Sequence, residues 1–188
     1  MTKPDLTQLT DRDQLGSFLN NYGLLGEAVE VGSLTGDYAR QIMSQWRGRR
    51  LTCCDPWEMQ DPNVYKEPVN STNWESCWQS CQSMAVQYSP RVDLLKAYSP
   101  QAADLFKDES LDALYIDANH SYECCSADLK AWWPKLIVGG VMGLHDFRTD
   151  LVWPQNCDVK TAVLEFAKNN GLRFHYTPPC GSVWFVKN

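Results

Sequence analysis

Short apolar runs alternate with helix-period segments along most of the chain. Five of these runs predict β-strands, separated by segments whose apolar positions lie on one face of a helix; they cover residues 28–31, 51–54, 92–95, 111–116 and 141–144. An amphipathic helix at 11–22 precedes the first run. Alternating strands and helices predict an α/β protein in which helices cover both faces of a mostly parallel sheet.

Two further runs, 172–176 and 182–186, end the pattern. Pro178, Pro179 and Gly181 lie between them and leave no room for a crossover helix, so we expect an antiparallel hairpin. The sequence thus predicts a Rossmann-like sheet of seven strands, formed by residues 1–188 as one domain with a helical lead-in at 1–24.

Capping and turn residues mark several element ends. Ser121 is expected to cap the helix before the fifth strand. The pair Gly139–Gly140 is expected to turn the chain into that strand, and the last helix should stop at Gly171.

Composition and charge narrow the class of protein. The chain has 17 Lys plus Arg against 23 Asp plus Glu, a formal net charge of −6. No basic stretch is longer than 47–50, which argues against nucleic acid as a partner. The sequence has no apolar run long enough to cross a bilayer and no apolar leader, so we expect a cytoplasmic protein that neither enters nor crosses a membrane.

The eight cysteines include no Cys-x-x-Cys pair. Adjacent pairs and the four-residue offset of Cys77 and Cys81 do not form a recognised zinc-binding pattern. We therefore expect reduced cysteines that pack as small hydrophobic residues.

Acidic residues close four of the predicted strands: Glu30, Asp55, Asp117 and Asp146. In parallel α/β sheets, ligands bind at the carboxyl ends of the strands. Four carboxylates at this edge are more than a core needs, so the edge is the candidate site.

The first strand leads into a glycine loop with the pattern Glu30-x-Gly32-x-x-x-Gly36. Such a loop either forms a tight turn or lets the backbone approach a ligand at a helix N-terminus. Asp55 lies 19 residues after Gly36 at the end of the second strand, where an acid can accept hydrogen bonds from ribose hydroxyls. A dinucleotide would favour a fuller glycine pattern, whereas an acid before the loop suits a ligand with a cationic end and no phosphate.

This combination resembles the class I S-adenosylmethionine-dependent methyltransferases, whose sheet also has seven strands and an antiparallel terminal hairpin. Within that class, the chain is similar to the branch that includes the macrocin-type O-methyltransferases of antibiotic sugars. The resemblance covers roughly residues 25–186 and is most specific at Ile116-Asp-x-x-His-Ser-Tyr-Glu123; it also rests on 29–32, 36–39, 128–133, 139–141 and 145–146.

The resemblance implies a set of cofactor-binding residues. The glycine loop would line the methionine end, Asp55 would hold the ribose, and Trp57 and Ser99 would contact the adenine. The implied set is Glu30, Gly32, Ser33, Gly36, Asp55, Trp57, Ser99 and Asp117. Trp57 can equally be a core aromatic on a loop.

Asp117 and His120 form an Asp-x-x-His pattern after the fourth strand. Methyl transfer needs the acceptor oxygen in line with the methyl group and a group that removes its proton. A histidine titrating near neutrality can take that proton. In the macrocin-type relatives the matching Asp binds magnesium and the matching His is the proposed base. A structural hydrogen bond is the simpler role for His120, and His145 is the alternative base.

His145–Asp146 departs from those relatives, which carry a Glu-Asp or similar pair to complete the magnesium site. Oxygen donors suit magnesium better than imidazole does. We therefore expect a weak Mg²⁺ site formed by Asp117 and Asp146, whose carboxylates should approach one another because they close adjacent strands. The His145–Asp146 pair also invites comparison with phosphohydrolases of the His-Asp type. That class would need His120, His145–Asp146 and Asp150 on a helical scaffold, whereas His145 follows a predicted strand.

Two long loops are expected to border the acceptor pocket: the segment between Asp55 and Trp74, and the segment 146–157 with Phe147, Arg148 and Trp153. The expected function is transfer of a methyl group from S-adenosylmethionine to a hydroxyl of a small molecule. A non-catalytic S-adenosylmethionine- or nucleotide-binding protein and a nucleotide-dependent oxidoreductase are the alternatives. The sequence leaves the acceptor open, as it does the formation of a homo-oligomer.

Overall fold

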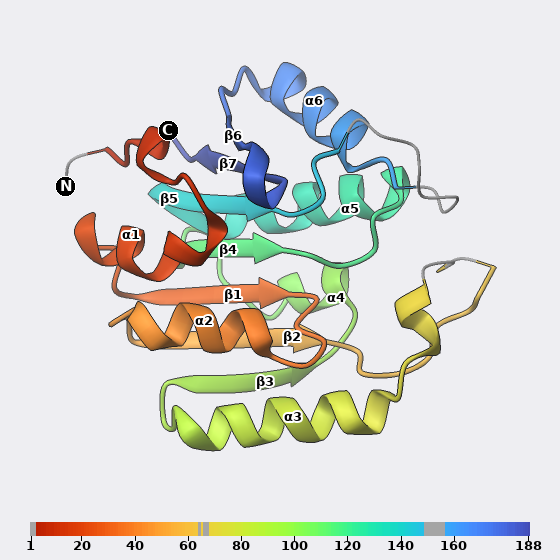
Figure 1. The fold of residues 1–188 in the computed structure, drawn as a ribbon. Helices are drawn as coiled ribbons and strands as arrows, with labels where there is room; N and C mark the ends of the chain where they lie inside the picture. Colours follow the sequence, from red (N-terminus) through yellow and green to blue (C-terminus); the bar gives the residue numbers. More distant parts are fainter. Residues whose placement is uncertain (1–2, 64, 66–67, 149–156) are drawn as a thin grey trace.

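Seven strands form one sheet in the order β3-β2-β1-β4-β5-β7-β6 (Figure 1). The structure is a computed structural model and describes residues 3–63, 65, 68–148 and 157–188. Strands β1 to β5 pair in parallel, β7 pairs antiparallel with β5, and β6 pairs antiparallel with β7. The predicted mostly parallel sheet with an antiparallel C-terminal hairpin is confirmed. The strands are β1 (Glu27–Val31), β2 (Arg50–Asp55), β3 (Val92–Lys96), β4 (Leu111–Ile116), β5 (Leu136–Leu144), β6 (His175–Thr177) and β7 (Ser182–Val186).

Helices cover both faces of the sheet (Figure 1). One face carries α1 (Leu15–Asn21), α2 (Asp37–Gln45) and α3 (Trp74–Gln87), and the other carries α4 (Ser99–Ala103), α5 (Tyr122–Trp132) and α6 (Val159–Asn170). Short 3-10 turns are η1 (Leu6–Gln8), η2 (Arg12–Gln14), η3 (Pro68–Ser71), η4 (Trp133–Lys135) and η5 (Pro178–Cys180). Among the described residues, none of the helices has the length and apolar character needed to cross a membrane.

Two hydrophobic cores follow from the alternation of side chains along the strands. On β4, Ala113 and Tyr115 belong to the core under α1 to α3, whereas Leu114 and Ile116 belong to the core under α4 to α6. Successive residues of a strand point to opposite faces, so a strand covered on both sides must be apolar throughout. This explains why the central strands appear in the sequence as continuous apolar runs.

The predicted caps are largely present. The Ser121 side chain accepts a hydrogen bond from the Cys124 amide at the start of α5, and Gly171 ends α6 with a left-handed backbone. The predicted opening helix at 11–22 is a 3-10 turn followed by α1, with Asp11 and Gln14 forming a capping box. The sixth strand is shorter and later than the predicted 172–176.

The prediction that Gly139–Gly140 turns the chain into the fifth strand is wrong. Both glycines lie inside β5, at a bulge in its pairing with β4. Leu111 pairs with Leu136 and Ala113 pairs with Val141, so β5 has extra residues between these two pairs. A Cβ at Gly140 would lie 2.9 Å from the Ile137 carbonyl oxygen, so the bulge has room only for glycine. Pairing with β4 on both sides of the bulge keeps the glycines in the strand.

Gly32, at the end of β1, lies directly against the chain that follows β4. Its amide donates to the Cys54 carbonyl (2.8 Å), and the Asp117 amide donates to the Val31 carbonyl (2.8 Å). With φ at +87°, a Cβ on Gly32 would lie 2.0 Å from the Asp117 carbonyl oxygen. A side chain here would push apart the two loops that carry the acidic strand ends.

Gly32→Ala should therefore destabilise the fold more than Gly139→Ala, a matched control with φ +84° and no atom within 4 Å of the added Cβ. Both variants bear the left-handed backbone strain of about 1 kcal/mol, and Gly32→Ala adds roughly 1 to 3 kcal/mol for the clash. Denaturant unfolding measures both. Equal losses would show that the close approach to Asp117 is not a constraint.

Candidate active site

A cleft of about 750 Å³ runs across the carboxyl edge of the sheet. Its size suits a small-molecule or cofactor site. It is lined from the ends of β1 to β4 and from η2, α2, α4 and α5. The lining includes Arg12, Glu30, Gly32, Ser33, Tyr38, Asp55, Ser99, Asp117, His120 and Asp128. The cleft therefore lies at the carboxyl edge of the sheet, where the acidic strand ends predicted the site.

Glu30 is a buried carboxyl group at the floor of the cleft. It exposes 2% of its surface, and in the described part of the chain its Oε2 has no hydrogen-bond partner. Burial, reinforced by the charge of Asp117, raises the pKa of Glu30 to about 8. A ligand with a cationic or hydrogen-bond-donating group would satisfy this oxygen.

Asp55 fixes two loops of the cleft. Its Oδ2 accepts a hydrogen bond from the Leu34 amide (3.0 Å) and its Oδ1 accepts one from the Trp57 amide (2.8 Å). Both donors have left-handed backbones, with φ of 47° and 43°, which the two bonds hold in place. Burial raises the pKa of Asp55. Each oxygen keeps a lone pair, so the group can also accept hydrogen bonds from a ligand.

Trp57 and Gly36 lie behind the cleft and do not line it. The Trp57 ring exposes 3% of its surface, donates to the Leu34 carbonyl (2.8 Å) and lies 4.8 Å from the Trp78 ring. A Cβ on Gly36 would lie 3.1 Å from both the Cys81 sulfur and the Met84 methyl carbon. Both residues support the loop from inside the core, and their contact with the cofactor stays a prediction.

Ser99 lines the cleft beyond the end of β3. Its hydroxyl donates to the Asp128 carboxyl and accepts a hydrogen bond from the Trp132 indole (3.0 Å). Asp128 also lines the cleft, from the buried face of α5, and sequence reasoning assigned it no role.

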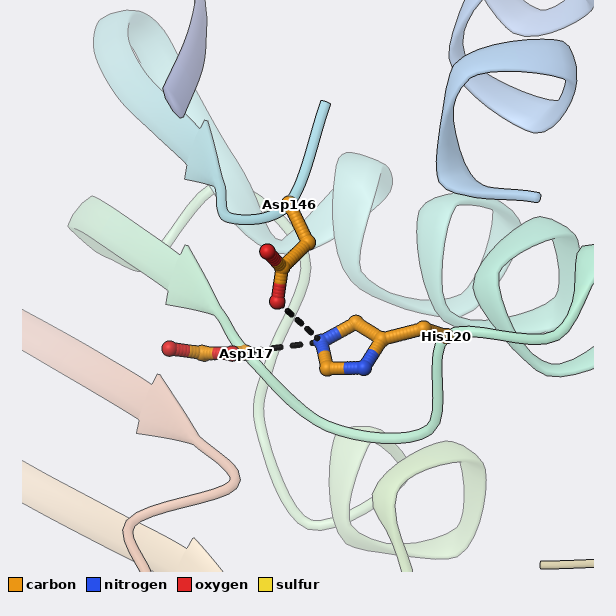
Figure 2. A group of neighbouring side chains, drawn as sticks. All are labelled: Asp117, His120 and Asp146. Carbon is orange, nitrogen blue, oxygen red and sulfur yellow. Dashed lines mark hydrogen bonds and ion pairs between the residues drawn. The ribbon is translucent and has the colours of Figure 1, made fainter. Parts of the chain in front are cut away.

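The ring of His120 lies between two carboxylates. Figure 2 shows its Nε2 facing both Asp117 and Asp146, at 3.3 Å from Asp117 Oδ1 and 3.3 Å from Asp146 Oδ2. One donor atom from each of these residues lies within 4.8 Å of the others, a spacing that can hold a metal ion. Strands β4 and β5 are parallel neighbours, so the expected approach of the two carboxylates is present.

His145 neutralises the same carboxylates from another side. Its Nδ1 lies 3.1 Å from Asp146 Oδ2 and 3.4 Å from Asp117 Oδ2. Burial disfavours the charged ring, but the hydrogen bonds and charges of the two carboxylates outweigh it and raise the pKa of His145 to about 9. The pKa values of Asp117 and Asp146 are correspondingly lowered, against the effect of burial. The raised pKa favours the charged ring, which makes His145 a less suitable base than a neutral imidazole. His145 also lies outside the cleft lining, as does Asp146.

Two arginines complete the cluster, and no motif in the sequence indicates either. Arg12 in η2 places one guanidinium nitrogen 3.4 Å from Asp117 Oδ2 and stacks over the Tyr38 ring at 4.9 Å. Arg148 donates from Nε to Asp146 Oδ1 at 2.8 Å. The neighbouring Asp117 and Tyr115 hold the pKa of Arg12 above its usual value despite burial. Arg12 reaches the site only because the N-terminal segment packs on α2, a tertiary contact without a sequence signature.

The first long loop borders the cleft, through Gln60, Tyr65, Val69 and Trp74. Most of the second, including Asp150 and Trp153, lies outside the described residues. Phe147 is buried against Phe174 and Tyr176.

A family model described as a methyltransferase domain matches residues 29–147. The chain belongs to this family. The match includes the glycine loop, Asp55, Ser99, the Asp117–His120 loop and His145–Asp146, so the resemblance seen in the sequence is confirmed at the level of the family. The match to a methyltransferase domain does not favour a phosphohydrolase or an oxidoreductase function. Comparison with curated proteins finds no match.

Solved structures share the fold at low sequence identity. The O-methyltransferase NovP superposes with a TM-score of 0.69 at 19% identity, over 97% of this chain and 80% of that one. A Staphylococcus aureus protein assigned as a caffeoyl-CoA O-methyltransferase gives 0.68 at 13% identity, over 100% and 86%. The Podospora anserina methyltransferase PaMTH1, solved with S-adenosylhomocysteine bound, gives 0.60 at 13% identity, over 86% and 70%.

The charge on His145 is expected to affect the stability of this methyltransferase domain. Folding raises the pKa of His145 from 6.5 to about 9, so its stabilisation is complete below pH 6.5 and is lost as the pH rises through 9. His145→Gln should lower the free energy of unfolding by on the order of 2 kcal/mol near pH 6, and the loss should shrink toward pH 9 and above. Denaturant unfolding of both proteins across this range tests the prediction. A loss independent of pH would mean that the ring is uncharged.

Proposed function

We propose that this methyltransferase transfers the methyl group of S-adenosylmethionine to a hydroxyl oxygen of a small molecule. The observation that carries the proposal is the position of His120: its ring lines the cleft beside the glycine loop, between two carboxylates. The O-methyltransferases among the solved structures of the same fold support the choice of an oxygen acceptor.

The order of groups along the cleft suits this cofactor. The glycine loop follows β1, Asp55 ends β2 and Ser99 follows β3, and these strands are neighbours in the order β1, β2, β3. The methionine, ribose and adenine parts would occupy these three positions in turn. The unsatisfied Glu30 carboxyl suits the cationic amino group of the methionine. When bound, the cofactor supplies an electrophilic methyl group on a sulfonium.

His120 would remove the proton from the acceptor hydroxyl. His120 Nε2 faces Asp117 and Asp146 at 3.3 Å and would donate its N–H to them, which leaves Nδ1 as the nitrogen of the neutral ring that accepts the proton. The two carboxylates would stabilise the positive ring that results. His145, Arg12 and Arg148 hold these two carboxylates in place. The pair would thus orient His120 and balance its charge.

Asp117, His120 and Asp146 have the donor types and spacing for a divalent cation. Two carboxylates suit Mg²⁺, while the imidazole in the set is more usual with Mn²⁺ or Zn²⁺. His145, Arg12 and Arg148 already neutralise the carboxylates, so a cation has to displace ion pairs to bind. We therefore propose a weak site held mainly by Asp117 and Asp146, where the ion would orient the acceptor oxygen and favour its deprotonation.

The class of acceptor and the cellular location are inferred from the net charge and the cysteines. The net charge of −6 argues for a small-molecule acceptor over a nucleic acid. A cytoplasmic location is in keeping with cysteines that pack as small hydrophobic residues, as Cys53, Cys81 and Cys125 do in the two cores.

Binding calorimetry with S-adenosylhomocysteine and with NAD tests the cofactor, and turnover of S-adenosylmethionine on a panel of phenols, sugars and hydroxy acids tests the reaction. Binding of S-adenosylhomocysteine but not NAD, together with methylation of a hydroxyl, is expected. Binding without turnover on any acceptor class would favour a non-catalytic binding protein.

His120→Ala should lower turnover by roughly 10² to 10⁴ and leave the affinity for S-adenosylhomocysteine nearly unchanged, because the base acts on the acceptor. His175→Ala, a histidine on β6 outside the cluster, is the control and should retain wild-type turnover. Steady-state kinetics and calorimetry make the comparison. Wild-type turnover in His120→Ala would remove the base assignment.

Chelation tests the metal site. Treatment with EDTA should lower turnover, and added Mg²⁺ or Mn²⁺ should restore it, because the weak site loses its ion readily. Asp146→Asn should raise the metal concentration needed for half-restoration, since it removes one carboxylate ligand. Turnover unaffected by EDTA, with no metal in the native mass spectrum, would refute the metal site and leave the methyltransferase proposal standing.

A further inference from the structure

Arg12 is a cation in a cleft that is otherwise rich in carboxyl groups. Among the described residues it is the one lysine or arginine of the lining, whereas the acids of the lining are Glu30, Asp37, Asp55, Asp117, Glu123 and Asp128. A guanidinium stays charged at any pH at which a protein works. An anionic group that enters the cleft therefore meets a favourable partner at Arg12 and carboxyl groups along most of the rest.

The guanidinium of Arg12 has donors that the protein does not use. Its Nη1 lies 3.4 Å from Asp117 Oδ2 and 3.5 Å from the Tyr115 hydroxyl oxygen, both long for hydrogen bonds. In the described part of the chain, Nε and Nη2 donate to no acceptor. These two nitrogens form one edge of the planar group, and a carboxylate can accept two parallel N–H bonds from such an edge.

The position of Arg12 is fixed before any ligand binds. The Tyr38 hydroxyl donates to the Arg12 carbonyl (2.9 Å), and the guanidinium stacks over the ring of the same tyrosine. Just upstream, the buried Leu9 accepts a hydrogen bond at its carbonyl from Thr177 Oγ1 (2.9 Å). Because the segment and the side chain are already held, little conformational entropy is lost when the free edge binds an anion.

Arg12 and His120 contact the same carboxylate. Arg12 Nη1 lies beside Asp117 Oδ2, and His120 Nε2 lies 3.3 Å from Asp117 Oδ1. An anion on Arg12 and a hydroxyl at the His120 ring are then separated by little more than the width of one carboxylate and its two contacts, which one small molecule spans. This step rests on the proposed function, because it takes the role of His120 from it.

The carboxylate of the cofactor has donors of its own. The amides of Ser33 and Thr35, in the glycine loop before α2, donate to no acceptor within the residues that the structure describes. Both residues line the cleft, and free amides before a helix bind carboxylates readily. The free edge of Arg12 therefore remains for the second substrate.

We propose that the methyl acceptor is a hydroxy acid and that Arg12 is the residue that selects it, by binding its carboxylate through Nε and Nη2. The acceptor oxygen takes the methyl group as the bond from that carbon to the sulfonium sulfur breaks, and the hydroxyl proton passes to His120. The products are S-adenosylhomocysteine and a methyl ether whose carboxylate is unchanged. Arg12 thus sets specificity and takes no part in the bond changes.

Calorimetry on the protein saturated with S-adenosylhomocysteine tests the selection at pH 7.5. The probes are hydroxy acids and their primary amides, such as lactate, 4-hydroxybenzoate and 4-hydroxycinnamate with lactamide, 4-hydroxybenzamide and 4-hydroxycinnamamide. Each pair has the same hydroxyl and differs in charge. At least one acid should bind about 10-fold more tightly than its amide or better, the difference of one hydrogen bond to a charged group. The same acid should be methylated with the higher kcat/KM.

Arg12→Gln identifies the residue responsible. It removes the charge and the fork, so the ratio of acid to amide affinity should fall by about 10-fold or more. Arg12→Lys keeps the charge without the planar fork and should give an intermediate ratio. Arg40→Gln is the matched control, because Arg40 also pairs with an aspartate, Asp37 (2.9 Å), but does not line the cleft. It should keep the wild-type ratio.

The outcomes separate this inference from the proposed function. A panel in which no acid binds more tightly than its amide, or an unchanged ratio in folded Arg12→Gln, would overturn the selection by Arg12 while the methyltransferase proposal stands. Weaker binding of S-adenosylhomocysteine to Arg12→Gln with an unchanged ratio would assign Arg12 to the carboxylate of the cofactor and overturn the inference as well. Absence of S-adenosylhomocysteine binding by the wild type would overturn the cofactor assignment itself.

Discussion

The convergence of acidic strand ends at one edge of the parallel sheet is the constraint on which the site depends. Glu30, Asp55 and Asp117 end neighbouring strands, and Asp146 follows the next strand along. Carboxylates so close together repel unless cations or hydrogen-bond donors satisfy them. The structure meets this requirement differently at each end of the cleft, and that difference divides the site into two parts.

At the β4–β5 end, protein cations supply the compensation. His145, Arg12 and Arg148 contact Asp117 and Asp146, and the His120 ring lies between the two carboxylates. At the other end the compensation is incomplete. Glu30 has an oxygen without a partner, Asp128 has only a hydroxyl, and burial raises the pKa of both. Groups that the protein leaves unsatisfied are those that a cationic and donor-rich cofactor can satisfy, which is why we propose cofactor binding at this end and catalysis at the first.

The sequence predicted what depends on local pattern and on strand order. Apolar runs located the strands, and the acids that close them located the edge of the cleft, because parallel strands end on the same side. Contacts set by packing between distant segments were not predictable. Arg12 reaches Asp117 across 105 positions of sequence, and Trp57 turns into the core because its indole bonds to Leu34. The glycines of β5 form a bulge and not a turn because β4 pairs on both sides of them, which only the register reveals.

The most direct test of this division is a crystal structure of the protein with S-adenosylhomocysteine bound. The account predicts the homocysteine over Gly32 with its amino group on Glu30, the ribose on Asp55, the purine at Ser99, and the sulfur on the side facing His120. A ligand bound in the reverse direction, or with its purine between Asp117 and Asp146, would contradict the account.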